Sequence, residues 1–211
     1  MHLYATNNSV ALHNKSMLNK LHKPVAVCSA EKHVDHTFTT SEEEQLDKTL
    51  LLCTGQKVML TCNLWVHAGL VNGALGTVIS ICYVPDSKPP ELPSFVVVDF
   101  KQYRGTTWDI SHPTHVPISP IRRGTRRQIP LRMAWALTIH KSQGMTLDQA
   151  TFDIGPKERQ DLTFTAISRF RSLTDLRIHP TFPFSHISRM KENPHLQRRK
   201  QEESLFTSKS I

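Results

Sequence analysis

The residue types best suited to chemistry in this chain lie together in the segment from His140 to Gly144. The segment reads His-Lys-Ser-Gln-Gly and directly follows the apolar run 133–139. Histidine, lysine and serine side chains donate hydrogen bonds to phosphate oxygens, and glycine lets the backbone approach a ligand closely. Gln143 can both donate and accept hydrogen bonds beside a nucleotide. The segment therefore suits phosphate binding, although a polar helix end with a solvated lysine is an equal alternative for these five residues alone.

A second candidate is Arg169, which ends the short apolar stretch that begins at Phe164. An arginine at the end of a helix can reach a nucleotide bound to a neighbouring domain and neutralise charge on a transferring γ-phosphoryl group. Arginines on a surface more commonly form ion pairs, and that alternative is favoured for Arg169 taken in isolation. The presence of 140–144 upstream of 164–169 favours the phosphate role instead.

Composition and charge narrow the class of protein only moderately. The chain has 211 residues, 38% of them hydrophobic, with a formal net charge of +8 and a pI of about 9.5. A basic surplus is typical of phosphate-backbone binders, but unrelated proteins share it. No signal peptide or apolar stretch of membrane-spanning length occurs, so we expect an intracellular protein that contacts no membrane. Free thiols in a reducing compartment are expected from four irregularly spaced cysteines, Cys28, Cys53, Cys62 and Cys82.

Two histidine pairs have the spacing His-x-x-His, namely His33 with His36 and His112 with His115. Such a spacing can bind a metal when further ligands converge on it. Both pairs lie in expected loops with no cysteine nearby. They therefore predict solvated histidines, and we expect no metal site.

Aromatic and basic residues give weaker signals for nucleic-acid binding. Trp65 and Trp108 could stack on bases, whereas Trp135 lies in an apolar run and more simply belongs to the core. The arginine-rich stretch 122–127 could contact a nucleic-acid backbone or form a solvated turn, and the sequence favours neither.

The elements that must position these residues are predicted to be strands and helices in alternation. A strand at 3–4 is followed by a loosely helical stretch to Leu21, and then by a polar segment, 23–48. A helix is predicted over 133–139 and another over 161–170, with strands at 150–154 and 176–178. This order favours an α/β domain. A small barrel is suggested by short candidate strands at 50–52, 57–61, 77–84, 95–100, 108–110 and 116–118.

Several segments taken together resemble the motifs of superfamily 1 DNA helicases, specifically the Pif/RecD-like branch. Residues 3–14 are similar to the fourth motif of that family, and residues 56–78 to a long family signature. Residues 128–147 resemble the fifth motif and residues 164–169 the sixth. The resemblance covers roughly residues 1–180. The Pro89–Pro93 loop and the tail from Ile178 to Lys191 look like those of mobile-element, Helitron-like members.

The resemblance implies a RecA-like α/β domain, the second of two and called 2A, with a small inserted SH3-like β-barrel called 2B. The implied boundaries are 1–22 for the first part of 2A, 23–49 for a polar linker or insertion, 50–128 mostly for 2B, 129–180 for the second part of 2A, and 181–211 for a polar tail.

The resemblance also implies a role for each candidate residue. In the family, single-stranded DNA lies across both RecA-like domains, and ATP binds in the cleft between them. By position, Arg169 would be the arginine finger, and Gln143 and Gly144 would couple DNA contact to the nucleotide. DNA contacts would come from Thr6, Asn7, Thr138, His140, Lys141 and Ser142.

The chain also departs from the family pattern. It has no G-x-x-x-x-G-K-[ST] phosphate loop and no acidic pair on a strand for Mg²⁺. ATP and Mg²⁺ would therefore be bound mainly by an N-terminal RecA-like domain, present in cis or in trans, and this chain alone is predicted to be inactive. Leu162 stands where the family often has glutamine, and Phe164 replaces a commoner tyrosine.

The function that the resemblance implies is the C-terminal motor half of an ATP-dependent 5′-to-3′ DNA helicase. DNA unwinding of this kind serves replication, repair, recombination or telomere maintenance, which places the protein in the nucleus or the mitochondrion. The alternative is a non-catalytic remnant of such a helicase that still binds single-stranded nucleic acid.

Overall fold

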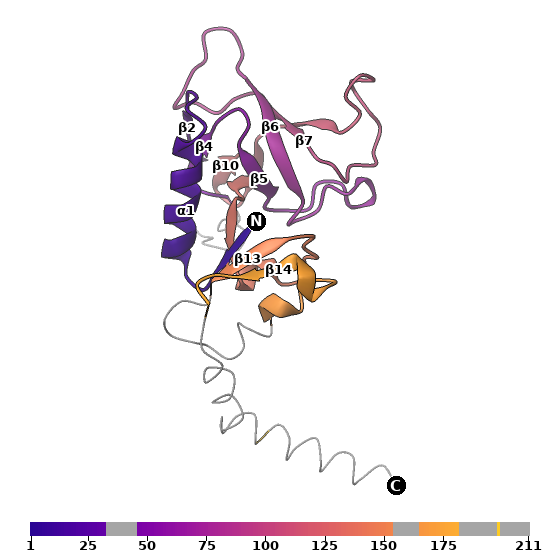
Figure 1. The fold of residues 1–211 in the computed structure, drawn as a ribbon. Coiled ribbons are helices and arrows are strands. Elements are labelled where there is room, and N and C mark those ends of the chain that lie inside the picture. The colour runs from indigo at the N-terminus through magenta and orange to yellow at the C-terminus, as the bar shows by residue number, and fades with distance from the viewer. Residues whose placement is uncertain (33–45, 154–164, 182–197, 199–211) are drawn as a thin grey trace. The chain divides into compact units, whose positions relative to one another are not determined.

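The computed structural model describes residues 1–32, 46–153, 165–181 and 198 (Figure 1). The described residues fall into two compact units. The first comprises Met1 and residues 7–137, and the second comprises residues 2–6 together with the residues from 138 onward. Among the described residues, no helix combines the length and the apolar character that crossing a bilayer requires.

The first unit is built on a five-stranded antiparallel sheet with the order β11-β5-β6-β7-β8. Its β-branched residues alternate along the strands or fill fully buried positions, as pleated strands favour. Val58, Val78, Val96 and Val98 are completely buried in its core. The strands are β5 (Lys57–Leu60), β6 (Leu75–Cys82), β7 (Phe95–Asp99), β8 (His115–Ile118) and β11 (Leu131–Met133).

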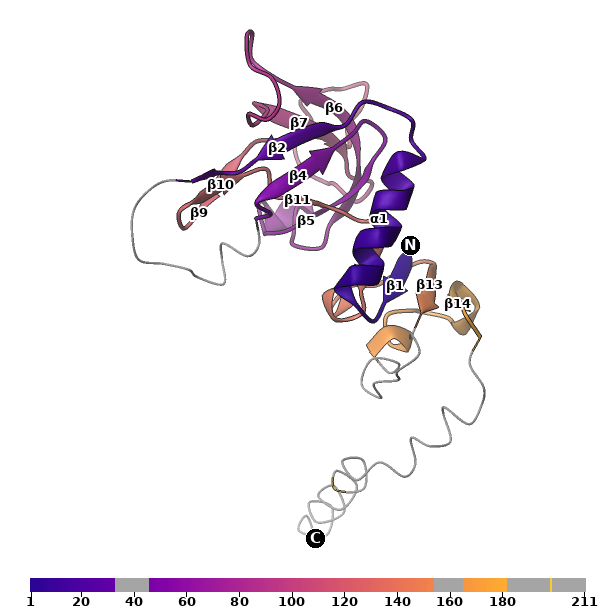
Figure 2. The ribbon, with the colours of Figure 1, turned by 90° about the vertical axis from the view of Figure 1, so that its left-hand side faces the viewer.

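Two smaller sheets complete the strands of the first unit. β2 (Ala26–Ser29) pairs with β4 (Thr49–Leu52), and the two lie side by side in Figure 2. β10 (Arg126–Gln128) pairs with both β3 (Glu31–Lys32) and β9 (Ile121–Arg123). A short 3-10 helix, η2, covers Val66–Ala68.

The polar segment 23–48 was predicted to be a linker or an insertion. Its described part contains β2 and β3. The strand signal in β2 is weak because only Ala26 and Cys28 face inward, and Cys28 joins the buried core. The rest of the prediction, residues 33–45, lies outside the described residues. The arginine-rich stretch 122–127 is a β-hairpin that turns at Gly124, whose φ is 54°.

The helix α1 (Asn7–Asn19) buries a polar side chain, Asn14, as well as the apolar Leu18. Asn14 is buried, and its Nδ2 donates to the carbonyl oxygen of Ala136 at 3.1 Å. The backbone N–H of Ala136 donates to Asn14 Oδ1 at 2.9 Å. Both backbone groups of Ala136, the first residue of β12 (Ala136–Thr138), are thus paired by one side chain.

The second unit contains parallel strands. β1 (His2–Tyr4) pairs with β13 (Ala150–Asp153), which pairs in turn with β14 (Leu176–Ile178). The full order of this sheet is β12-β1-β13-β14, so strands far apart in the sequence are neighbours. A 3-10 helix, η4, spans Leu173–Asp175 just before β14.

Two sequence predictions in this part of the chain are wrong. The predicted helix over 133–139 is instead the end of β11 and the strand β12, because β5, β1 and Asn14 provide hydrogen-bond partners for an extended backbone. The predicted strand at 108–110 is a turn, in which the Asp109 carboxylate accepts from the Ser111 N–H. Of the predicted helix over 161–170, residues 165–167 are helical, and residues 161–164 lie outside the described residues.

Gly76 in β6 is a position where the core leaves no room for a side chain. A Cβ built there would lie 2.5 Å from Val98 Cγ1 and 3.0 Å from the Asp99 carbonyl oxygen. We predict that Gly76→Ala lowers the free energy of unfolding by about 1–3 kcal/mol, the usual cost of overpacking. Urea denaturation measures this loss.

A double-mutant cycle provides the control for Gly76. The additional change Val98→Ala removes the Cγ1 atom that would clash, so the cost of Gly76→Ala should be smaller in that background. An unchanged or higher stability of the single variant Gly76→Ala would contradict the prediction.

Candidate functional site

The segment that the sequence singled out forms a tight turn directly after β12. η3 covers His140–Ser142, and the Ser142 hydroxyl, fully buried, donates to the Ile139 carbonyl at 2.7 Å. The Lys141 N–H donates to the Thr138 hydroxyl at 3.4 Å. Thr138 and Ser142 therefore brace the turn from within, since both side chains are buried.

The remaining residues of the segment face solvent. His140, Lys141, Gln143 and Gly144 are all exposed. Gly144 has a φ of +84°, and a Cβ built on it would meet no atom within 4 Å. Glycine is thus favoured here by the left-handed backbone conformation rather than by lack of space. The turn presents a cationic and an amide side chain beside an open stretch of backbone.

The structure brings the start of the chain to this turn. The Ile139 N–H donates to the Tyr4 carbonyl oxygen at 3.0 Å. Ile139 immediately precedes His140, and Tyr4 lies two residues before Thr6, which is exposed. Two segments predicted to contact DNA, far apart in the sequence, therefore meet at one place in the second unit. Asn7, also exposed, begins α1.

Arg169 follows the helical residues 165–167 and is partly buried. Its Nε donates to the Thr165 carbonyl at 3.1 Å, and its Nη2 donates to the Ser168 hydroxyl at 2.9 Å. Within the described ranges it forms no ion pair with a carboxylate. The guanidinium therefore donates to neutral acceptors of its own turn.

The two candidate segments are joined by their backbones. The Leu147 N–H donates to the Arg169 carbonyl at 3.0 Å, and Leu147 forms a parallel bridge with Phe170. Leu147 lies three residues after Gly144. The turn at 140–144 and the arginine at 169 thus belong to neighbouring stretches of the second unit.

The weaker candidates for nucleic-acid binding are the arginines of 122–127 and the three tryptophans. In the basic hairpin, Arg127 forms an ion pair with Glu31 at 2.9 Å, and Arg126 donates to the Leu46 carbonyl. These arginines hold β10 within its own unit. Trp135 is partly buried, as its apolar neighbours suggested, whereas Trp65 and Trp108 are 46% and 57% exposed.

Sequence reasoning missed the role of Asn14. It lies in the segment similar to the fourth motif, yet nothing in the residue types around it indicates a partner 122 positions away. The available signal is a polar residue four positions before Leu18, the other residue of α1 that is buried. Sequence reasoning also missed a grouping of Asp109 with His112 and His115 in the first unit.

Known proteins that are similar to the chain point to one family. No protein-family model matches the sequence. The ATP-dependent DNA helicase PIF1 of Homo sapiens is 33% identical over 174 residues, which are 81% of this chain and 26% of that protein. The PIF1 helicase of Danio rerio is 35% identical over 140 residues, which are 66% of this chain and 21% of that protein. The chain spans about a quarter of the length of these curated relatives.

Solved structures show the same likeness in the fold. The Pif1 helicase of Candida albicans superposes with a TM-score of 0.66 at 24% identity, covering 86% of this chain and 46% of that one. A Bacteroides Pif1 bound to single-stranded DNA gives 0.57 at 20% identity, covering 97% and 46%. A Bacteroides Pif1 in complex with ADP-AlF4 gives 0.61 at 20% identity, covering 86% and 40%.

The parallel strands β1, β13 and β14, together with these likenesses, fit the α/β architecture of a RecA-like domain. The family expected from the sequence is the family of the relatives found. The chain therefore belongs to the Pif1 family of ATP-dependent DNA helicases, of which it represents a C-terminal part.

Proposed function

We propose that this chain is the C-terminal motor half of an ATP-dependent 5′-to-3′ DNA helicase. The observation that carries the proposal is the junction of the 140–144 turn with the Arg169 segment through the Leu147–Arg169 hydrogen bond. A helicase must couple its grip on DNA to the state of its nucleotide. Neighbouring backbone segments, one for each ligand, are a direct physical means of such coupling.

In this proposal the exposed side of the 140–144 turn binds the DNA backbone. His140 and Lys141 donate to phosphates, with Thr6 and Asn7 as further contacts from the start of the chain. Thr138 and Ser142 act by keeping the turn in shape, since their hydroxyls bond within it. A Bacteroides relative has been solved with single-stranded DNA, which supports this choice of nucleic acid.

The nucleotide is proposed to bind mainly to another domain. The printed sequence has neither a phosphate loop nor an acidic pair on a strand, so its residues do not make a site for ATP and Mg²⁺ by themselves. An N-terminal RecA-like domain, in cis or in trans, supplies that site. Gln143 and Gly144 then sense the nucleotide, and Arg169 neutralises charge on the γ-phosphoryl group as it is transferred.

We also propose an inserted domain, a cellular role and a location for the full protein, from the resemblance to the family. We infer that the strands within residues 50–128, which include β5, β6, β7 and β8 of the five-stranded sheet, form most of the inserted SH3-like domain 2B. The full protein is proposed to unwind DNA in replication, repair, recombination or telomere maintenance, in the nucleus or the mitochondrion. Membership of a mobile-element branch stays a prediction from the Pro89–Pro93 loop.

The proposal is tested by the double variant His140→Ala/Lys141→Ala in this 211-residue chain. We expect weaker binding of single-stranded DNA, with a shallower dependence on salt. Each lost phosphate contact lowers the slope of log K against log salt by about 0.7 for single strands. Fluorescence anisotropy with a labelled oligothymidine, titrated at several salt concentrations, measures both changes.

A matched control removes the same residue types elsewhere. His22 and Lys23 are adjacent and exposed, and asparagine tolerates the φ of 49° at position 22. His22→Asn/Lys23→Ala should leave affinity and salt slope near those of the unmodified chain. Equal losses in both double variants would overturn the assignment of the turn.

ATP turnover measured on the same samples distinguishes the motor half from a binding remnant. The chain alone should show no turnover, with or without DNA, and DNA-stimulated turnover would require a nucleotide site within it. Addition of a Pif1-family N-terminal RecA-like domain should restore turnover if the chain is a motor half. Binding of DNA without restored turnover would favour the remnant.

A further inference from the structure

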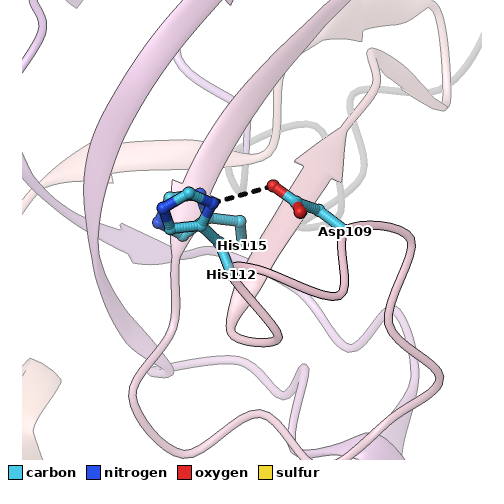
Figure 3. Close-up of side chains that lie close together, drawn as sticks. All are labelled: Asp109, His112 and His115. Atoms are coloured by element: carbon cyan, nitrogen blue, oxygen red, sulfur yellow. Dashed lines mark hydrogen bonds and ion pairs between the residues drawn. The ribbon is translucent and has the colours of Figure 1, made fainter.

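Three potential metal ligands converge in the first unit, far in sequence from the residues assigned above. Asp109, His112 and His115 each offer a ligand atom, and these atoms all lie within 4.8 Å of one another. Figure 3 shows the two imidazole rings beside the carboxylate. The rings are stacked with centroids 4.5 Å apart and an angle of 9° between their planes. His112 Nδ1 lies 2.9 Å from Asp109 Oδ2.

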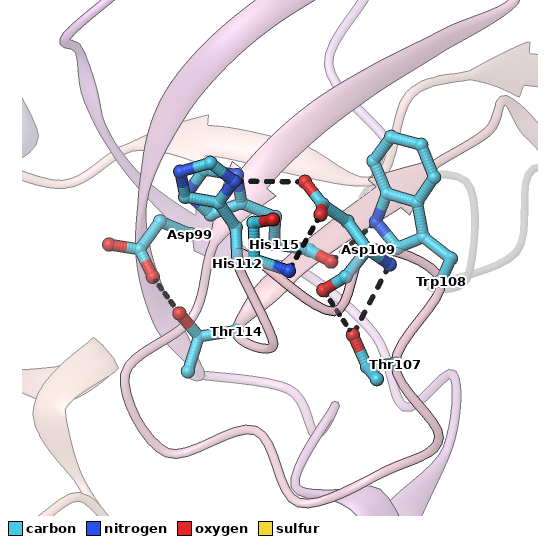
Figure 4. A network of polar contacts seen from close by, with 8 residues as sticks. Asp99, Thr107, Trp108, Asp109, His112, Thr114 and His115 are labelled. Carbon is cyan, nitrogen blue, oxygen red and sulfur yellow. Dashed lines mark hydrogen bonds and ion pairs between the residues drawn. The ribbon is translucent and has the colours of Figure 1, made fainter.

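The loop between β7 and β8 holds these side chains in place by its own hydrogen bonds (Figure 4). The Thr107 hydroxyl donates to the Asp109 carbonyl at 2.6 Å. The His115 N–H donates to the His112 carbonyl at 3.0 Å, and Trp108 Nε1 donates to the His115 carbonyl at 2.6 Å. The backbone carbonyl of each candidate ligand therefore accepts a hydrogen bond within the loop, which fixes the backbone positions from which the three side chains converge.

The β-sheet anchors one end of the cluster. His115 is the first residue of β8 and pairs with Asp99 of β7. The Asp99 carboxylate accepts from the Thr114 hydroxyl at 2.6 Å and pairs with Lys101 at 2.8 Å. The Asp99 carboxylate is thus engaged by these two partners, and the carboxylate bonded to His112 is that of Asp109.

An Asp109–His112 ion pair alone would be the simplest account of the cluster. It explains two of the three residues but leaves the ring of His115 stacked on that of His112. One carboxylate oxygen and two imidazole nitrogens form a donor set that Zn²⁺ accepts.

We propose that Asp109, His112 and His115 form a surface site for a divalent cation of the Zn²⁺ type, which clamps the β7–β8 loop to the start of β8. Tetrahedral coordination with bonds of about 2.0–2.1 Å places donor atoms roughly 3.4 Å apart. Small side-chain rotations bring donors that lie within 4.8 Å to that spacing. The fourth position is left to water or to an anion. This site departs from the sequence expectation, which counted the His112–His115 pair without Asp109.

The test is Zn²⁺ binding by the 211-residue chain, measured by competition with a chromophoric chelator. We expect one equivalent to bind, and Asp109→Asn or His115→Gln to weaken it about ten- to a hundred-fold or more, as loss of even a ligand-orienting partner does elsewhere. Two controls are His67→Gln, an exposed single histidine, and His33→Gln/His36→Gln, the other His-x-x-His pair. Both controls should retain the affinity of the unmodified chain.

Co²⁺ spectroscopy and hydrogen exchange supply readouts that a purely structural ion pair would not change. Bound Co²⁺ should give a tetrahedral spectrum without thiolate-to-metal bands, which excludes the cysteines as ligands. Zn²⁺ should slow amide exchange at Ser111, His112, Thr114 and His115 in the unmodified chain and in both controls, but not in Asp109→Asn. Unchanged Zn²⁺ affinity in Asp109→Asn and His115→Gln, or a loss of affinity in the His33/His36 control, would overturn the site. Neither outcome bears on DNA binding or ATP turnover.

Discussion

Replacement of Arg169 by alanine in the complete helicase is expected to abolish most ATP turnover while leaving affinity for single-stranded DNA near that of the unmodified enzyme. The guanidinium would stabilise charge that develops on the γ-phosphoryl group only in the transition state. Arginine fingers in other phosphoryl-transfer enzymes contribute about 10³- to 10⁵-fold to kcat. Steady-state ATPase kinetics with saturating DNA, together with anisotropy for DNA affinity, measure the two effects separately.

Two controls separate this role from structural damage. Arg169 also donates to the Ser168 hydroxyl, so Ser168→Ala removes that local bond while keeping the guanidinium. Arg171 is exposed and lies two residues further along the chain. The variant Arg171→Ala removes the same positive charge as Arg169→Ala. Both control variants should retain most turnover. Turnover near that of the unmodified enzyme in Arg169→Ala would mean that Arg169 is not the finger.

Replacement of Asn14 by alanine is expected to lower the free energy of unfolding by about 2–4 kcal/mol, because it leaves two buried backbone groups without hydrogen-bond partners. The Ala136 N–H and carbonyl both lose their partner, and each unpaired buried group has a substantial desolvation cost. Ala136 opens the strand that leads to the 140–144 turn, so DNA affinity should fall as well. Urea denaturation followed by circular dichroism measures the stability.

Two control variants test whether the hydrogen bonds of the Asn14 side chain carry this effect. Asn14→Asp keeps an acceptor for the Ala136 N–H, but its ionised carboxylate cannot donate to the Ala136 carbonyl. A protonated carboxyl can donate, so this variant should lose less stability at a pH where the carboxyl is protonated. Asn19→Ala, at the exposed end of the same helix, should change stability by less than about 0.5 kcal/mol. A similarly small effect for Asn14→Ala would show that water or a rearranged backbone replaces its bonds.

Much of the fold was predictable where strands have a regular pattern of their own. β6 and β7 are runs of β-branched residues bounded by glycine or proline, and the sequence prediction placed both within a few residues. β1, β13 and β14 were predicted for the same reason. Local pattern is sufficient for such strands because each buries apolar side chains at a period set by its own backbone.

The run 133–139 shows why other elements were not predictable. Its apolar residues are compatible with a helix or a strand, and the outcome depends on which partners the backbone finds. Those partners are β5, β1 and Asn14, all distant in sequence. The same dependence on distant segments explains β2, which pairs with β4 across residues outside the described ranges.

The sequence by itself determined the family, through the order of its motifs. It also singled out the 140–144 segment and Arg169 as residues that could bind phosphate or act on a nucleotide. Only the tertiary structure decided that these segments are neighbours, that Thr138 and Ser142 are buried braces, and that Asp109 joins a histidine pair. The physical reason is that residue types and spacing are local properties of the chain. Burial and hydrogen-bond partners depend on which distant segments fold against it.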